Sequence, residues 1–158
     1  MKTLIVYGSR YGCTQRCAGL LEARLAGEVT LHNVSESDEV DLDQFEQVVI
    51  GTPIYMGRIL PQVSRFCQQH HDQLLQKPLA VFVCCGFPDK AEAQLHSAFS
   101  QELLAHARFK DTFGYALNFE KMSFLDRLIV RMVSKEKSSQ SRIDEDKINA
   151  LAALMNEK

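Results

Sequence analysis

The sequence predicts an α/β fold in which helices cover both faces of a parallel sheet. Short runs of β-branched and apolar residues alternate along the chain with segments whose apolar residues recur at helical spacing. The runs are almost wholly apolar, which is typical of strands buried on both faces. At 158 residues and 46% hydrophobic content, the chain is long enough for one domain with a full core.

Five runs are expected to form the strands. They are Thr3–Tyr7, Val29–Val34, Gln47–Thr52, Leu79–Cys85 and Phe113–Phe119. Four apolar stripes between and after them predict helices, because their members lie three or four residues apart. The stripes are Cys17, Leu20, Leu21 and Leu25; Val63, Phe66 and Cys67, with Pro61 in the first turn; Leu95, Ala98, Phe99 and Leu103; and Ile148, Leu151, Ala152 and Met155.

Two polar segments interrupt this pattern. Ser35–Glu46 carries six acidic residues and is expected to be either a short helix or an irregular connection. Its acids favour a solvated surface over a metal site, because alternating polar positions rarely converge. Lys135–Ser141, rich in Lys, Ser and Glu, predicts a mobile loop.

Charge and cysteine content narrow the class of partner and the compartment. The net charge is −2 and no dense Lys/Arg tract occurs, so nucleic acid is not expected as a partner. No apolar run approaches the roughly 20 residues of a membrane span, and no signal peptide is recognisable. Five cysteines without a CxxC pair favour a reducing compartment, so we expect the protein to be cytoplasmic.

The turn after the first predicted strand has the character of a phosphate site. Its residues are Ser9, Arg10, Tyr11, Gly12, Cys13 and Thr14. Backbone amides at a helix N-terminus lack acceptors and carry the positive end of the helix dipole, and hydroxyls at Ser9 and Thr14 add uncharged donors. Arg10 is expected either to pair with the phosphate or to point into water. The alternative is an ordinary strand-to-helix turn of small residues.

Two further loops are expected at the same edge, because ligands of open parallel sheets lie beyond the carboxyl ends of the strands. They comprise Thr52, Pro53, Ile54, Tyr55, Met56 and Gly57 after the third strand, and Cys85, Gly86 and Phe87 after the fourth. Tyr55, Met56 and Phe87 offer faces to a flat apolar ring. Flavin mononucleotide (FMN) has one phosphate and such a ring, whereas a Walker A lysine and a G-x-G-x-x-G motif are both absent.

Gly57 has two interpretations. Without a Cβ, its peptide can turn its carbonyl toward a flavin ring and accept a hydrogen bond there. Alternatively, the turn itself demands a positive φ and the glycine serves only that.

The strand followed by Ser9-x-x-Gly12-x-Thr14, together with the Thr52–Gly57 loop, resembles the flavodoxin family over essentially the whole chain. The resemblance implies a flavodoxin-like, doubly wound five-stranded parallel sheet of order 2-1-3-4-5 in a three-layer α/β/α arrangement. It also implies noncovalent FMN and one domain over residues 1–158. Tyr11 stands where many flavodoxins carry Thr.

An extra helical segment is expected at about 120–142. Its Phe124-Leu125-Asp126-Arg127 resembles the aromatic-x-Asp-Arg segment of menaquinone-dependent protoporphyrinogen IX dehydrogenases, which are flavodoxin-fold enzymes. The resemblance implies an oxidoreductase that passes electrons through FMN to a quinone, with a porphyrinogen as substrate. The alternatives are a non-enzymatic electron carrier between a reductase and an acceptor protein, and an FMN-free scaffold or sensor. No residue can be named from the sequence as a catalytic acid or base.

The same extra helix presents an apolar stripe flanked by basic residues. The stripe is Leu125, Leu128, Ile129, Met132 and Val133, and the flanking residues are Arg127, Arg131 and Lys135. Such a stripe either packs on the body of the protein or forms an interfacial helix. The second interpretation leaves open a peripheral contact with the inner membrane face.

The cysteines and histidines are not expected to form a metal site. Cys17, Cys67 and Cys84 fall on predicted core faces, where cysteine behaves as a small hydrophobe. The five histidines show no ligand spacing. Cys13, near a helix N-terminus, is expected to have a lowered pKa and a reactive thiol.

Overall fold

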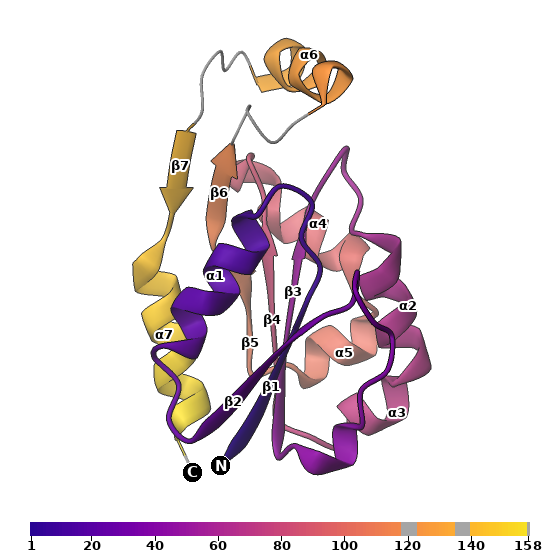
Figure 1. Cartoon of the computed structure of the whole chain (residues 1–158), viewed down its shortest axis with the longest axis vertical. Helices are drawn as coiled ribbons and strands as arrows, with labels where there is room; N and C mark the ends of the chain where they lie inside the picture. Colours follow the sequence, from indigo (N-terminus) through magenta and orange to yellow (C-terminus); the bar gives the residue numbers. More distant parts are fainter. Residues whose placement is uncertain (118–122, 135–139, 158) are drawn as a thin grey trace.

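A computed structural model of the chain describes residues 1–117, 123–134 and 140–157. Five parallel strands form one sheet of order β2-β1-β3-β4-β5 (Figure 1), which confirms the predicted fold class and strand order. The strands are β1 (Lys2–Tyr7), β2 (Glu28–Asn33), β3 (Gln47–Pro53), β4 (Leu79–Cys84) and β5 (Phe109–Thr112). Four of them lie within two residues of the predicted bounds at each end.

Helices pack on both faces of the sheet because successive strand residues point to opposite sides. Ile5, Val49 and Phe82 belong to one core cluster, with α1 (Cys13–Glu22) and α7 (Glu145–Asn156). Leu4, Val48 and Val81 belong to the other, with α2 (Pro61–Gln69), α3 (His71–Leu74), α4 (Ala91–Ala98) and α5 (Gln101–His106). Figure 1 shows these two groups of helices on opposite sides of the sheet, so the three layers follow directly from the alternation.

The predicted fifth strand is wrong in position. The sheet ends with β5, and the chain then leaves it at Gly114, whose φ is 86°, to form β6 (Gly114–Leu117). β6 pairs antiparallel with β7 (Gln140–Ile143) in a separate two-stranded sheet. A Cβ at Gly114 would lie 2.0 Å from the Arg142 carbonyl oxygen, so this close pairing requires glycine. Asn118 and Phe119 lie outside the described residues.

Phe113 accounts for the difference between the apolar pattern and the observed strand. Its ring stacks on Phe82 with 4.3 Å between ring centroids, and it is fully buried. The apolar residue is therefore a core anchor at the junction of β5 and β6, not the start of the fifth strand.

The helix expected across Leu95–Leu103 is in fact two helices. Phe99 has extended backbone angles, and the Ser100 hydroxyl accepts a hydrogen bond of 3.2 Å from the Leu103 amide, which starts α5. The acidic segment Ser35–Glu46 forms only the short 3₁₀ turn η1 (Leu42–Gln44), and a second turn, η2 (Pro88–Lys90), precedes α4. The segment expected to be a mobile loop lies largely outside the described residues, but Gln140 and Ser141 begin β7.

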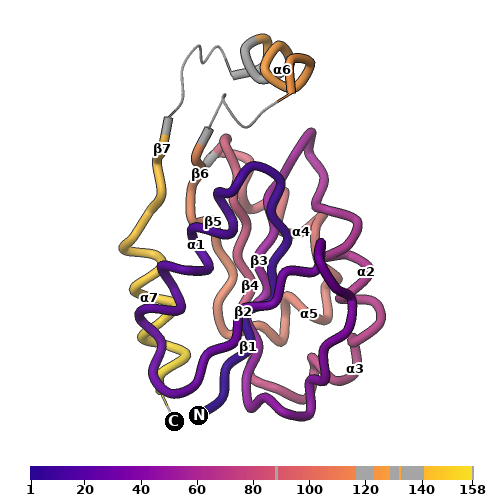
Figure 2. The backbone as a smooth tube through the Cα atoms, in the orientation of Figure 1, coloured from indigo at the N-terminus to yellow at the C-terminus, as the bar shows by residue number. Residues whose placement is uncertain are grey.

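The extra helix predicted from the sequence is present as α6 (Phe124–Ser134). Both the ribbon and the backbone trace place it beyond the carboxyl ends of the strands, above the turns that follow β1 and β3 (Figure 1, Figure 2). Phe124, Leu125, Leu128 and Met132 are strongly exposed, so these residues do not pack on the body. Within the described residues no helix is both long and apolar enough to cross a membrane.

Candidate functional site

The first loop leaves the N-terminus of α1 available to an anion. Gly12, with φ 91°, is the N-cap residue, no side chain caps the helix, and its first turn contains no acidic residue. The amide of Gly12 donates a 3.1 Å hydrogen bond to Ser9 Oγ, which holds the turn closed. Ser9 through Gly12 form the turn itself, and Cys13 and Thr14 are the first residues of α1. The geometry is that of a helix N-terminus able to bind phosphate.

Thr14 provides the observation that points most directly to a ligand. Its side chain is fully buried, and Thr14 Oγ1 has no hydrogen-bond partner among the described residues. A buried hydroxyl without a partner costs about 1–3 kcal/mol, so such groups call for an explanation. A phosphate at the helix N-terminus would supply the missing partner, so the residues present fit the phosphate group of FMN.

The second loop begins at the buried end of β3, with Thr52 and Pro53. Beyond Ile54, Tyr55 and Arg58 exchange backbone hydrogen bonds of 2.9 and 3.0 Å around a tight turn. The two central residues have positive φ, 52° at Met56 and 73° at Gly57, as in a type I′ turn. The turn projects Met56, which is 64% exposed, from the same sheet edge as the first loop. The structure thus shows that Gly57 meets a demand for positive φ.

Replacing Gly57 with alanine is expected to lower the free energy of unfolding by about 1 kcal/mol, because an L residue is strained at this φ. Gly86→Ala is the matched control. Neither glycine has a heavy atom within 4 Å of where a Cβ would stand, but Gly86 has no positive φ. Gly86→Ala should be neutral or stabilise by up to about 1 kcal/mol. Urea denaturation measures both, and equal effects at the two positions would show that backbone strain is not the cause.

The third loop follows β4 and starts beside the second, because the Ile54 amide donates a 2.8 Å hydrogen bond to the Cys84 carbonyl. Cys85 is buried, its thiol contacts the Gln94 side chain, and its sulfur accepts a 3.3 Å hydrogen bond from the Phe87 amide. Phe87 is 38% exposed, with Lys90 Nζ 5.6 Å from its ring centroid. Gly86 between them is exposed. The Cys85 side chain therefore supports the loop, and Phe87 supplies its exposed ring.

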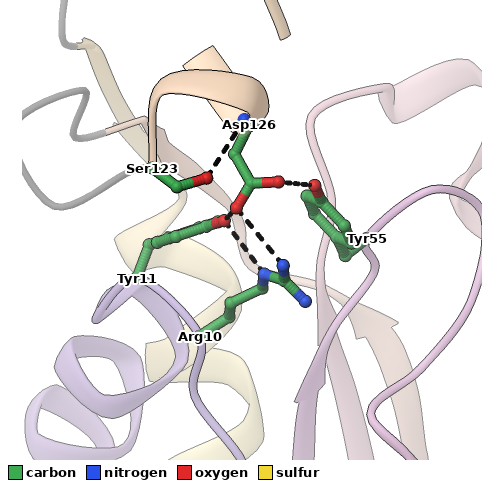
Figure 3. A network of polar contacts seen from close by, with 5 residues as sticks. All are labelled: Arg10, Tyr11, Tyr55, Ser123 and Asp126. Atoms are coloured by element: carbon green, nitrogen blue, oxygen red, sulfur yellow. Dashed lines mark hydrogen bonds and ion pairs between the residues drawn. The ribbon is translucent and has the colours of Figure 1, made fainter. Parts of the chain in front are cut away.

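A carboxylate from α6 joins the first two loops. The hydroxyls of Tyr11 and Tyr55 donate to opposite oxygens of Asp126, and Arg10 Nη2 lies 3.2 Å from Asp126 Oδ2 (Figure 3). The Arg10 guanidinium also lies over the Tyr55 ring, 3.9 Å from its centroid. The Ser123 hydroxyl accepts a 3.2 Å hydrogen bond from the Asp126 amide. We call Arg10, Tyr11, Tyr55 and Asp126 the Asp126 cluster.

The sequence left open whether Arg10 pairs with the phosphate or points into water. In the structure its guanidinium pairs with the Asp126 carboxylate, which comes from a distant segment. Its side chain is 40% exposed and that of Asp126 only 12%. Sequence reasoning did not place Asp126 in the site, although the aromatic-x-Asp-Arg segment singled it out. The spacing of 115 residues between Tyr11 and Asp126 gave no signal that they touch.

Comparison with known proteins identifies the family of this chain. A family model described as a flavodoxin domain matches residues 4–144. The chain belongs to the flavodoxin domain family. Among curated proteins, this flavodoxin-domain chain is 24% identical over 145 residues to protoporphyrinogen IX dehydrogenase (quinone) of Escherichia coli strain K12, a match covering 85% of the chain and 80% of that protein. The family resemblance predicted from the sequence is confirmed.

Solved structures share the fold at low identity. A WrbA-like flavodoxin from Agrobacterium tumefaciens superposes with a TM-score of 0.57 at 19% identity, covering 98% of this chain and 95% of its own. A Fusobacterium nucleatum flavodoxin bound to FMN gives a TM-score of 0.52 at 13% identity, covering 69% and 68%. Rubredoxin oxygen:oxidoreductase of Desulfovibrio gigas gives 0.54 at 18% identity; the match covers 96% of this chain, which spans only 37% of that protein.

Cys13 of this flavodoxin domain has an unusual environment. Hydrogen bonds from the thiols of Cys17 and Cys84, with a further one from the Ala116 backbone, hold the pKa of Cys13 well below its ordinary value. The same contacts stabilise the protonated thiols of Cys17 and Cys84, whose pKa values are raised. The structure thus agrees with the expectation of a lowered Cys13 pKa and gives it a cause beyond the helix N-terminus.

Cys13 is expected to react with iodoacetamide at a nearly constant rate between pH 6 and 8. An ordinary thiol, with a pKa of about 8.5, is only about 1% ionised at pH 6.5 and gains reactivity steadily above it. Because these contacts lower the pKa of Cys13 to about 4, its thiolate is already formed across this range. Cys85 is an internal control, since burial raises its pKa. Peptide mass spectrometry follows both sites, and a Cys13 rate that rises with pH like that of a free thiol would contradict the assignment.

Proposed function

We propose that this chain binds FMN noncovalently, with its phosphate at the N-terminus of α1 and its ring beside the Thr52–Gly57 loop. The buried Thr14 hydroxyl without a partner, at a helix N-terminus that no side chain caps, carries this proposal. A flavodoxin of the same fold has been solved with FMN bound, which supports the choice of ligand. When bound, FMN supplies electron transfer, and the protein tunes it through stacking, hydrogen bonds and charge.

We assign the phosphate to backbone amides and hydroxyls. Ser9, Gly12 and Thr14 surround the start of α1, and Cys13 contributes its amide. Arg10 and Tyr11 are engaged with Asp126, so their part is to hold α6 near the site. Met56 and Phe87 are assigned to border the ring, together with the face of Tyr55 that Arg10 does not cover, and Cys85 and Gly86 shape the third loop.

The proposed reaction is electron transfer from a porphyrinogen through FMN to a quinone. Phe124, Leu125 and Met132 of α6 are 79%, 68% and 75% exposed, and the Asp126 cluster ties this helix to the first two loops. Porphyrinogens and quinones are large apolar molecules, and an exposed apolar face beside the flavin suits such reactants better than a small polar one. The distant relationship to an E. coli protoporphyrinogen IX dehydrogenase points the same way.

A direct comparison of two assays tests this reaction. The FMN-loaded protein is given protoporphyrinogen and a quinone in one assay, and a flavoprotein reductase with a cytochrome acceptor in the other. Turnover in the first supports the oxidoreductase. Activity confined to the second would replace it with the alternative of a flavodoxin-type electron carrier between two proteins.

We further propose that the protein works in the cytoplasm and touches the inner membrane face through the apolar residues of α6. The test is co-sedimentation with anionic, quinone-containing vesicles at low salt. Leu125→Glu should reduce the bound fraction severalfold, because a charge replaces an exposed apolar contact. Absence of wild-type binding would remove the membrane from the proposal without affecting FMN.

A further inference from the structure

Three cysteine sulfurs meet beneath the first loop. Cys13 is the first residue of α1, Cys17 lies one turn later, and Cys84 ends β4. Their Sγ atoms all lie within 4.8 Å of one another, and those of Cys17 and Cys84 are 3.7 Å apart. Cys17 and Cys84 are buried, whereas Cys13 is partly exposed. The sequence predicted burial for two of them but not the convergence of three.

The spacing matches that of three thiolates around one metal ion. Metal–thiolate bonds are about 2.3 Å long, so three sulfurs in a plane around one ion lie about 4 Å apart. The cysteines need to move by less than 1 Å to reach this arrangement. Their backbones are held by β4 and by the buried face of α1, so the three donors are largely preorganised.

The donor set selects the kind of ion. Thiolates favour soft cations such as Cu(I) and Zn(II) over hard ones. The group contains three cysteines and, among the residues that the structure describes, no histidine or carboxylate close enough to complete it. Zn(II) in structural sites takes four protein ligands, whereas Cu(I) is satisfied by three sulfurs. The arrangement therefore favours Cu(I).

We propose that Cys13, Cys17 and Cys84 bind one Cu(I) ion in trigonal coordination on the α1 side of β4. No electron is transferred: Cu(I) joins the Cys13 thiolate, and the thiols of Cys17 and Cys84 each lose a proton to solvent as their sulfur–copper bonds form. Arg16, one residue from Cys17 on α1, lies close enough to offset part of the negative charge of the three thiolates. Binding needs no flavin and is independent of the proposed function.

The first test titrates fully reduced protein, prepared without flavin, with Cu(I) under anaerobic conditions against a coloured Cu(I) chelator. We expect one Cu(I) per chain and three Cu–S bonds of about 2.3 Å by X-ray absorption. Cys17→Ala and Cys84→Ala should each weaken binding at least 100-fold. Cys67→Ala, which removes a buried cysteine on the opposite face of the sheet, should leave it unchanged.

Thermal unfolding of each variant shows whether it is folded, and a second measurement uses the wild-type protein alone. Bound Cu(I) should slow iodoacetamide labelling of Cys13 at least tenfold. The labelling rate of a cysteine-containing peptide added to the same reaction should stay unchanged. Labelling of Cys13 at an unchanged rate would overturn the proposal. So would Cu(I) binding that survives in folded Cys17→Ala and Cys84→Ala, or a site that holds Zn(II) in preference to Cu(I).

Discussion

Thr14→Val is expected to weaken FMN binding about 10- to 100-fold while leaving the flavin-free protein as stable as the wild type or more so. The side chains are nearly isosteric, and in the flavin-free protein the Thr14 hydroxyl has no hydrogen-bond partner among the described residues. Valine therefore removes a buried polar group that costs free energy. A hydrogen bond to a charged phosphate is worth about 1.5–3 kcal/mol, and each 1.4 kcal/mol is about a tenfold change in affinity.

Two controls show whether the loss of affinity comes from the contact between Thr14 and the phosphate. Riboflavin lacks the phosphate, so its affinity should be the same in Thr14→Val and the wild type. Thr3→Val makes the same chemical change at a buried threonine near the start of β1, at the end of the strand away from the first loop. The Thr3 hydroxyl accepts a 2.6 Å hydrogen bond from the Gln47 side chain. This change should lower stability by about 1–2 kcal/mol and leave FMN affinity unchanged. Flavin fluorescence and urea denaturation supply the two readouts; a Thr14→Val protein that binds FMN normally would refute the phosphate assignment.

Asp126→Ala is expected to raise the rate of trypsin cleavage after Arg127 about 10- to 100-fold. Asp126 accepts from two tyrosine hydroxyls and pairs with Arg10, and hydrogen bonds to a charged group contribute about 1.5–3 kcal/mol. Four apolar residues of α6 are exposed, and in the part of the chain that the structure describes the Asp126 cluster joins this helix to the first two loops. Proteolysis of a native protein follows the population in which the segment has opened.

Conservative changes separate the hydrogen bonds from the helix itself. Asp126→Asn keeps the shape and one accepting oxygen, so its cleavage rate should be intermediate. Tyr55→Phe removes one donor, and in the Asp126→Ala background it should add little, because its partner is already gone. Cleavage within α1 should remain slow throughout. If Asp126→Ala and the wild type are cut after Arg127 at equal rates, α6 does not depend on the cluster.

The parts of the fold that could be predicted are those set by local pattern. Leu4, Ile5 and Val6 are uniformly apolar because a central parallel strand is buried on both faces, and the stripe Ile148–Met155 has the spacing of one buried helix face. The turn from β1 into α1 could be placed because its glycine and hydroxyls are adjacent in the chain, and its use for a phosphate stays a prediction. Such features depend on few residues at short separation.

The errors arise where tertiary contacts override the pattern. The apolar pattern places Phe113 in a strand, but its ring stacks on Phe82 at the end of β5. The helical spacing places Ser100 inside one helix, but its hydroxyl caps the start of α5. The Asp126 cluster and the three cysteines join residues more than 60 positions apart, and nothing local encodes such contacts. The apolar stripe of α6 is a related case: periodicity predicts the face but not what covers it.

The central claim is that the α1 N-terminus anchors the phosphate of FMN. Its most direct test is to titrate the flavin-free protein with FMN and, separately, with riboflavin, and to measure binding by the quenching of flavin fluorescence. Anchoring of the phosphate by the α1 N-terminus predicts saturable one-to-one binding in which FMN is held at least 100-fold more tightly than riboflavin. Equal affinity for the two flavins, or fluorescence unchanged by the protein, would contradict it.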